Sequence, residues 1–278
     1  MSIGNFLAKT AVRVPLLIWS VIVIFPIVWM VIGAFKSNAE IFASPWSLPE
    51  TFNFSNFVSA WQDFKIGSAF FNSLFVTFVG AILTLMFAIP TTYALERLRF
   101  RGSNVLFNIY LASMMIPAVL GWIPLFFLLM RMDLLDNLFA LALVYAVSQI
   151  PFTIFILSSF MGNVPRELEE AAAIDGMSQY GILLKVVTPL VKTGIITATI
   201  LNAISFWNEY FLALILLQTD SKNTLGVQMS ALSTTAQYES AWGALFAGLT
   251  IAVIPIIIFY AIFQRHIVKG MVEGAVKG

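Results

Sequence analysis

The sequence EEAAAIDGMSQYGILLKVVTPL, Glu169–Leu190, lies between two long apolar runs and is the most polar interruption of the second half of the chain. It contains three acidic residues, two glycines and a proline, whereas the whole chain is 60% hydrophobic and only 10% charged. Soluble proteins carry about 25% charged residues. The chain is therefore predicted to be an integral membrane protein, and this passage a surface segment between two spans.

Two short helices are predicted within this segment. Pro165 suits a first helical turn, because its missing N–H would be unpaired there in any case, and the acidic residues that follow are favoured by the helix dipole. Gly176 suits the left-handed conformation that ends a helix. A narrow face of the first helix is predicted to hold Leu168, Ala171, Ala172 and Asp175. A second helix is predicted to begin at Ser178 and to bury Ile182, Leu183, Val186 and Val187.

Six apolar stretches are long enough to cross a bilayer, which takes about 20 helical residues. They are Val14–Phe35, Ala69–Leu95, Val105–Met130, Leu138–Met161, Leu190–Leu217 and Ala241–Phe263. The third holds Pro117 and Pro124 and is predicted to be kinked. The first is longer than the apolar core of a signal peptide and is predicted to remain as an anchor. The predicted fold is an all-α membrane protein with one transmembrane domain over residues 1–278.

Lysine and arginine are unevenly distributed between the two sets of connections. By the positive-inside rule, this bias places both termini, the Arg97–Arg101 turn and the Glu169–Leu190 segment in the cytoplasm. The three arginines of that turn are assigned no role beyond topology. On the other side, Asp136 is predicted to lie in solvent in the short turn before the fourth stretch.

Several kinds of chemistry are excluded by composition and spacing. The chain has no cysteine and a single histidine, His266, so it offers neither thiolate catalysis nor a clustered histidine metal site. Gly176 and Gly181 have the spacing of a phosphate-binding loop but lack the lysine that must follow. No basic run suggests nucleic-acid binding. The chain is predicted not to be an enzyme and to use no metal or cofactor, so any ATP hydrolysis must come from another polypeptide.

The segment EAAAIDG, Glu170–Gly176, resembles the EAA loop of permease subunits of bacterial ABC importers. That motif reads Glu-Ala-Ala, three residues, Gly, nine residues, Ile-x-Leu-Pro. The matching positions are Glu170, Ala171, Ala172, Gly176 and Pro189. Val186 replaces the isoleucine and Thr188 replaces the leucine. The resemblance implies that residues 162–189 form a coupling loop, with Asp175 among its contacts, that sits in a groove of a cytoplasmic ATPase.

Other segments resemble carbohydrate importers of the maltose family. FWNEYFLALIL in the fifth stretch is similar to these permeases, and QRHIVKGMVEGAVKG at the end is similar to the tail of the MalG-type subunit. The resemblance implies a type I importer with a second permease subunit, a cytoplasmic ATPase dimer, an extracellular solute-binding protein that meets the last outer loop, and a sugar substrate. It also implies contact between the ATPase and the tail, residues 264–278, through Gln264, Gly270, Gly274, Lys277 and Gly278.

Polar residues recur in the fifth stretch at helical spacing. Intramembrane polar groups face the bundle interior or an aqueous cavity, so a role in lining the transport pathway is assigned to Asn202, Ser205, Asn208, Glu209 and Tyr210. Two alternatives stay open: hydrogen bonds between helices, and a place for Glu209 near the outer interface. The predicted function is thus a multi-pass permease of the bacterial cell membrane that lines half of an alternating-access pathway. The rival is a self-contained secondary transporter or channel with Glu209 as its ion site.

Overall fold

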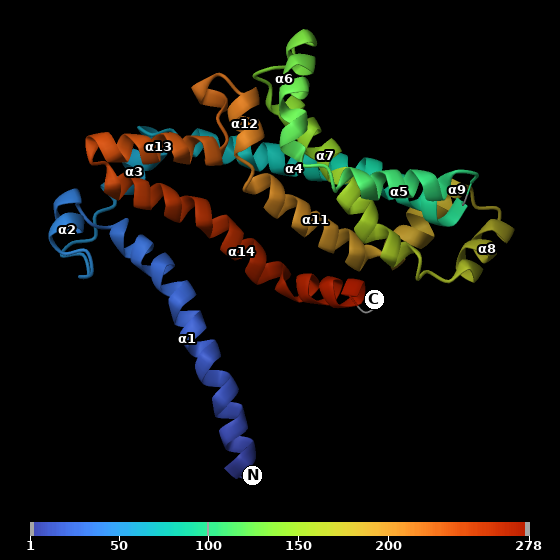
Figure 1. The fold of residues 1–278 in the computed structure, drawn as a ribbon, viewed down its shortest axis with the longest axis horizontal. Coiled ribbons are helices and arrows are strands. Elements are labelled where there is room, and N and C mark those ends of the chain that lie inside the picture. Colours follow the sequence, from blue (N-terminus) through green and yellow to red (C-terminus); the bar gives the residue numbers. More distant parts are fainter. Residues whose placement is uncertain (1–2, 99, 276–278) are drawn as a thin grey trace. The chain divides into compact units, whose positions relative to one another are not determined.

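The computed structural model describes residues 3–98 and 100–275, with side chains placed from residue 13 to residue 264 apart from residue 99 (Figure 1). All the secondary structure within these ranges is helical, and no strand occurs in them. The predicted all-α class is therefore confirmed. The described chain has four unbroken helices long and apolar enough to span a membrane, or up to six spans if the two bent pairs of helices are each counted as one span.

The four unbroken spans lie where the apolar stretches predicted them. They belong to α1 (Ile3–Gly33), α4 (Ile66–Tyr93) with the π-helical turn η1 (Ala94–Leu98), α7 (Leu138–Met161) and α14 (Trp242–Ala275). Helix α1 begins well before the apolar window that starts at Arg13. Helix α14 likewise continues past Gln264, so the backbone of the predicted tail is helical as far as the structure describes it.

The third predicted span is broken rather than kinked. Helix α5 (Ser103–Ser113) ends before Pro117, and the chain resumes through the 3₁₀ turn η2 (Ala118–Gly121) into α6 (Trp122–Arg131), with the two parts bent by 96°. A proline cannot donate the hydrogen bond that would continue α5. Each part is about 15 Å long, roughly half the thickness of the hydrocarbon core.

The fifth predicted span, Leu190–Leu217, starts close to the observed helix but extends too far at its other end. Helix α11 (Lys192–Trp207) forms most of it, and a 79° bend separates α11 from the preceding helical segment Gln179–Leu190. At the other end, the helix stops at Trp207, and a separate helix α12 (Phe211–Leu216) follows. A 3₁₀ turn, η4 (Asp220–Lys222), leads on to α13 (Leu225–Glu239).

The helices pack into two compact units, which are described separately. The first comprises residues 3–67 and 228–255, with α1, α2 (Asn38–Ala43), α3 (Ser55–Gln62), most of α13 and the first part of α14. The Asn56 amide donates to the carbonyls of Ala34 (2.9 Å) and Lys36 (2.8 Å), and the Gly243 amide donates to Asn38 (3.0 Å). These bonds order the segment between the first two spans.

The second unit comprises residues 68–227 and 256–275, and α7 runs through its core. Buried residues of α4, α7, α11 and α12 form the main apolar cluster, which includes Val76, Leu141, Tyr145, Phe206 and Leu216. Helices α7 and α11 approach closely at Gly194, where an added Cβ would lie 2.5 Å from the ring of Phe160. This close packing holds the polar residues of α11 against α7.

Candidate functional site

The predicted coupling loop is a set of short helices in the second unit. Helix α8 (Arg166–Ile174) is followed by a turn, by α9 (Gln179–Ile182), by the π-helical turn η3 (Leu183–Val187) and by α10 (Thr188–Leu190); α8 and α9 pack on each other (Figure 1). Gly176 has φ +81°, so it adopts the left-handed conformation that the sequence predicted. The Ser178 hydroxyl accepts a hydrogen bond from the Gly181 amide at 3.3 Å and caps α9. Both predicted helices are confirmed.

An apolar cluster lies beneath the loop and fixes it to the ends of the spans. Its buried members from the loop are Val164, Ala172, Ile182, Leu183 and Val187, and those from neighbouring helices are Tyr93, Met161 and Val191. The predicted burial of three residues in the second helix is confirmed, while Val186 is half-buried. Ala172 is only 8% exposed. The predicted narrow face was therefore wrong for Ala172, which packs inside the chain.

The outer surface of the loop carries exposed apolar side chains, of which Ile174 and Tyr180 are the most exposed and were not predicted from the sequence. Ile174 is 86% exposed and Tyr180 is 76% exposed. Glu170, Ala171 and Asp175 are also exposed around them. Ile174 follows Ala172 by two residues, which is about 200° around a helix, so an isoleucine opposite the buried alanine was a signal that could have revealed this surface.

One acidic residue of α8 faces inward instead. The Glu169 carboxylate accepts hydrogen bonds from Arg97 Nε (2.5 Å) and from the Tyr93 hydroxyl (3.1 Å). The Tyr93 hydroxyl also lies 3.0 Å from Gln179 Oε1. Arg97 is 5% exposed and Glu169 is 14% exposed. The assignment of Arg97 to topology alone is thus wrong, because this arginine forms a buried ion pair with the loop.

The junction of the loop with α11 is shaped by the two motif positions at its end. Pro189 lies in the first turn of α10, where no N–H is needed. The Thr188 hydroxyl donates to the Leu183 carbonyl at 2.7 Å and so closes the π-helical turn η3. The 79° bend follows at Val191. Thr188, the departure from the family motif, therefore supplies a hydrogen bond that leucine could not make.

Two polar residues of α11 form hydrogen bonds with the neighbouring helix α7. Asn202 is fully buried, and its amide donates to the Thr153 hydroxyl of α7 at 2.9 Å. The Ser205 hydroxyl accepts from the Gln149 amide of α7 at 2.9 Å, and the Asn208 amide donates to the Ile204 carbonyl at 2.8 Å. The contact of Asn202 is the interhelical bond that had been left open as an alternative. Ser205 and Asn208 remain exposed in this chain.

Glu209 lies beyond the end of α11, in the break before α12. Its carboxylate accepts hydrogen bonds from the amides of Leu212 (2.7 Å) and Ala213 (3.1 Å) and from the Tyr145 hydroxyl. The next residue, Tyr210, is half-buried against the main apolar cluster. The placement of Glu209 on one face of the α11 helix is therefore wrong, since its carboxylate caps the first turn of α12.

Two of the predicted tail residues, Lys277 and Gly278, lie outside the described residues. Gly270 and Gly274 belong to the helical backbone of α14. Gln264 is exposed, and its amide donates to the Ala261 carbonyl at 3.1 Å. The tail contact with an ATPase stays a prediction.

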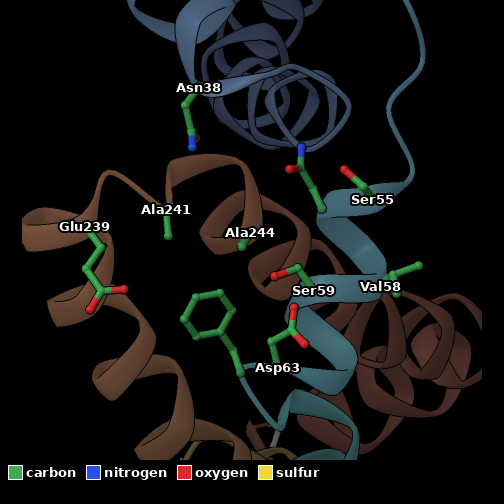
Figure 2. A pocket seen from close by; sticks show the side chains of 10 residues that line it. Asn38, Ser55, Val58, Ser59, Asp63, Glu239, Ala241 and Ala244 are labelled. Atoms are coloured by element: carbon green, nitrogen blue, oxygen red, sulfur yellow. The ribbon is translucent and has the colours of Figure 1, made fainter.

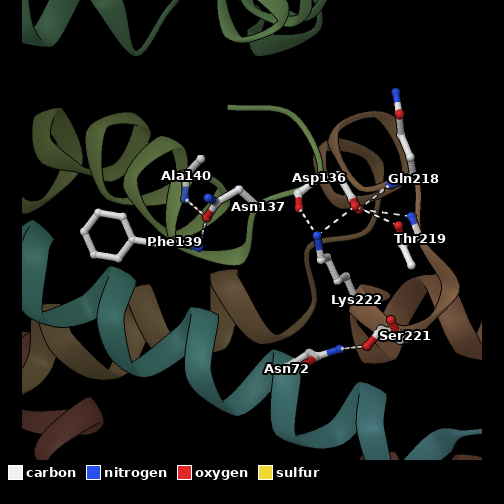
Figure 3. A network of polar contacts seen from close by, with 9 residues as sticks. All are labelled: Asn72, Asp136, Asn137, Phe139, Ala140, Gln218, Thr219, Ser221 and Lys222. Atoms are coloured by element: carbon white, nitrogen blue, oxygen red, sulfur yellow. Dashed lines mark hydrogen bonds and ion pairs between the residues drawn. The ribbon is translucent and has the colours of Figure 1, made fainter. Parts of the chain in front are cut away.

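A polar network holds the loop after α12 (Figure 3). Asp136 accepts from the amides of Gln218 and Thr219, both at 3.0 Å, and pairs with Lys222 at 2.8 Å. Burial of the Asp136 carboxyl raises its pKa, but the hydrogen bonds from Lys222, Gln218 and Thr219 outweigh this and hold the pKa well below its ordinary value. Asp136 was predicted to lie in solvent, but it is half-buried and bonded to Lys222, Gln218 and Thr219.

A polar cavity of about 580 Å³ occurs in the first unit (Figure 2). Asn38, Asn56, Asp63 and Glu239 contribute its polar groups, and none of its lining residues is basic. Such a lining offers carboxylates and amides for hydrogen bonding. Within the described residues, however, no group of three potential metal ligands occurs.

Long apolar helices, two broken spans and a polar helical loop at the end of the second unit define a polytopic membrane protein. Residues 85–273, more than half of the chain, match the family described as binding-protein-dependent transport system inner membrane component. The chain belongs to this family. It is therefore an integral membrane permease subunit of the ABC importer class.

Relatives and a solved structure agree with this family. The chain is 36% identical to the diacetylchitobiose uptake system permease protein NgcG of Streptomyces coelicolor, over 93% of this chain and 86% of the relative. It is 32% identical to the trehalose transport system permease protein SugB of Mycobacterium tuberculosis, over 92% and 93%. The crystal structure of a bacterial ABC transporter that imports the acidic polysaccharide alginate contains a similar chain, with a TM-score of 0.83 and 29% identity over 95% of this chain and 98% of that one.

Proposed function

We propose that this chain is one of two permease subunits of an ATP-driven importer of mono- or oligosaccharides. It lines half of an alternating-access pathway and hydrolyses no ATP itself. The proposal for sugars is supported by the relatives, because the substrates in the names of the three compared transporters (diacetylchitobiose, trehalose and alginate) are all carbohydrates. Of the polar residues assigned to the transport pathway, Ser205 and Asn208 are exposed in this chain. These two residues are therefore the candidates for contact with the transported sugar.

In this proposal the coupling loop, residues 162–189, docks on a cytoplasmic ATPase dimer. The excess of lysine and arginine on its side of the membrane supports this orientation, with both termini in the cytoplasm. The tail, residues 264–278, makes a second contact with the ATPase. A solute-binding protein delivers sugar to the opposite side, and residues 1–278 act as one transmembrane domain.

The observation that carries the proposal is the exposed surface of the loop. A side chain as apolar and as exposed as Ile174 gains about 1.5–3 kcal/mol when it is buried, and Tyr180 adds an exposed aromatic ring on the next helix, α9. Glu170 and Asp175 provide charge around this apolar centre. Interfaces bind most strongly where an apolar centre is surrounded by a polar rim, so this surface has the composition of a docking site.

The test is the affinity of the reconstituted complex for its ATPase. Ile174→Ala is expected to weaken ATPase binding roughly tenfold, because about 1.4 kcal/mol of apolar contact is lost. Met115→Ala is the control, since Met115 is 85% exposed but lies between α5 and α6. Glu170→Lys is expected to abolish solute-stimulated ATP hydrolysis while membrane insertion is retained.

Equal weakening by Ile174→Ala and Met115→Ala would refute the proposed docking surface.

The rival function, a self-contained secondary transporter, needs a carboxylate that can exchange an ion. The carboxylate oxygens of Glu209 are instead bonded to two amides and a tyrosine hydroxyl. Uncoupler-sensitive transport by the purified chain alone would establish the rival, whereas the importer requires a second permease and an ATPase.

A further inference from the structure

The coupling loop is joined to the spans by more than the chain that leads into α11. Glu169 on α8 lies opposite Tyr93 and Arg97, which end the long span Ile66–Leu98. Arg97 donates to one carboxylate oxygen through Nε, and the Tyr93 hydroxyl lies 3.1 Å from the other. Both oxygens of Glu169 are therefore occupied by groups from one other helix.

Arg97 also reaches the end of a third element. Its Nη1 lies 3.4 Å from the carbonyl of Met161, the last residue of α7. The guanidinium is planar and its donors have fixed directions. One side chain thus connects the end of α7 with α8, and its own backbone belongs to the turn that ends the second span.

The position of Arg97 in the chain is unusual. It lies in η1, a π-helical turn, and π-helical turns occur frequently at functional sites. The coupling loop contains a second such turn, η3, before the bend at Val191. The Arg97 contact and the chain into α11 therefore each include a π-helical turn, whereas residues 162–165 join α7 directly to α8.

The ion pair between Arg97 and Glu169 is buried, and it fixes the position of one side chain relative to the other. Arg97 and Glu169 are 5% and 14% exposed, so removal of either partner leaves a charge with little access to water. The surrounding apolar cluster is non-directional and tolerates sliding. This ion pair therefore fixes one point of α8, Glu169, to one point of the second span, Arg97.

We propose that Arg97 and Glu169 form a latch that transmits the movement of α8 to the second span, in parallel with the chain connections to α7 and α11. This inference rests on the proposed coupling function. The two residues are positioning residues: they bind neither the sugar nor the nucleotide. The latch makes the coupling loop and the end of the second span move as one body when the ATPase closes.

The experiment uses the reconstituted complex of both permeases, the ATPase and the binding protein, and measures sugar transported per ATP hydrolysed. Arg97→Gln and Glu169→Gln are expected to lower this ratio by at least about fivefold, the lower limit of a typical coupling free energy. The exchange of charges in Arg97→Glu with Glu169→Arg is expected to restore most of it. Arg101→Gln, at an exposed neighbour of Arg97 in the same turn, is expected to leave the ratio unchanged.

A spin label supplies a readout independent of transport. The chain has no cysteine, so a single Glu167→Cys label reports on α8 without competing sites. Arg97→Gln is expected to increase the mobility of this label, and Arg101→Gln is not.

The latch is overturned if the single variants keep the wild-type ratio, or if they lose ATPase binding altogether and the charge exchange does not restore it. Failure of the underlying function looks different, because wild-type complex would then show no sugar-stimulated ATP hydrolysis at all.

Discussion

Substitution of Gly176 tests whether the turn of the coupling loop touches a partner. Gly176 has φ +81°, and a Cβ added there would meet nothing within 4 Å in this chain. A side chain in the left-handed region costs about 1–2 kcal/mol. Gly102, in the turn before α5, has φ +94° and the same free space around it. Gly176→Leu and Gly102→Leu therefore impose the same strain on the chain itself.

The two variants are expected to differ only in the assembled complex. A leucine that projects into an occupied groove adds overpacking of about 1–3 kcal/mol, equivalent to a roughly 5- to 150-fold loss of coupling. Solute-stimulated ATP hydrolysis in nanodiscs should fall by that factor for Gly176→Leu and remain unchanged for Gly102→Leu. Thermal unfolding of the isolated chain should shift equally in both. Gly176→Ala should lie between wild type and Gly176→Leu.

Equal losses of stimulated hydrolysis in Gly176→Leu and Gly102→Leu would refute this reasoning, because strain alone would then account for the effect. Normal stimulation in Gly176→Leu would show that no partner surface approaches the turn.

Three further predictions concern the polar groups of the second unit. A double-mutant cycle of Asn202→Ala and Thr153→Ala should give a coupling energy of about 0.6–1.7 kcal/mol in thermal unfolding, whereas a changed sugar preference in Asn202→Ala would favour pathway lining. Glu209→Gln should retain transport that is insensitive to uncouplers, because the amide oxygen of glutamine still caps α12. Tyr145→Phe should destabilise the chain by about 1 kcal/mol, because the hydrogen bond to Glu209 is lost. A proton-coupled uptake that is lost in Glu209→Gln would contradict this prediction. The folded pKa of Asp136 is lowered, so its contribution is present above its unfolded pKa of about 4 and is lost as the pH falls through the lowered value. Unfolding at pH 7 should therefore be easier in Asp136→Asn by about 1 kcal/mol, and a difference that persists unchanged at pH 2 would exclude this cause.

The features set by local chemistry were predictable from the sequence. Gly176 ends α8 and Ser178 caps α9 because a left-handed turn and an N-terminal hydroxyl act within a few residues. The apolar stretches likewise located the unbroken spans, because a run of about 20 apolar residues has the length and composition of a transmembrane helix.

The features that depend on distant partners were not predictable in the same way. Arg97 and Glu169 are 72 positions apart, so charge counting found the arginine but not its role. Ala172 is small enough for either a core or a surface contact, and only the packing of α8 decides between them. The two prolines of the third span predicted a disturbance, but the 96° bend depends on how α5 and α6 pack.

The placement of Glu209 failed for a different reason. Its helical spacing from Ser205 assumed that one helix continued to Leu217. The chain instead ends α11 at Trp207 and begins a new helix. Periodicity in sequence is meaningful only while the helix that produces it is unbroken.

The bend at Val191 joins two helical segments of unequal length, which act as the two arms of a lever. The arm that carries the loop, from Gln179 to Leu190, is roughly 18 Å long, and the arm formed by α11 is roughly 24 Å long. If both arms turn as a rigid 79° elbow, the far end travels about 1.3 times as far as the near end, so a rotation of about 10° displaces Trp207 by about 4 Å. A displacement of about 3 Å at the loop, less than one helical turn, is thereby enlarged at the end of α11 where Ser205 and Asn208 are exposed.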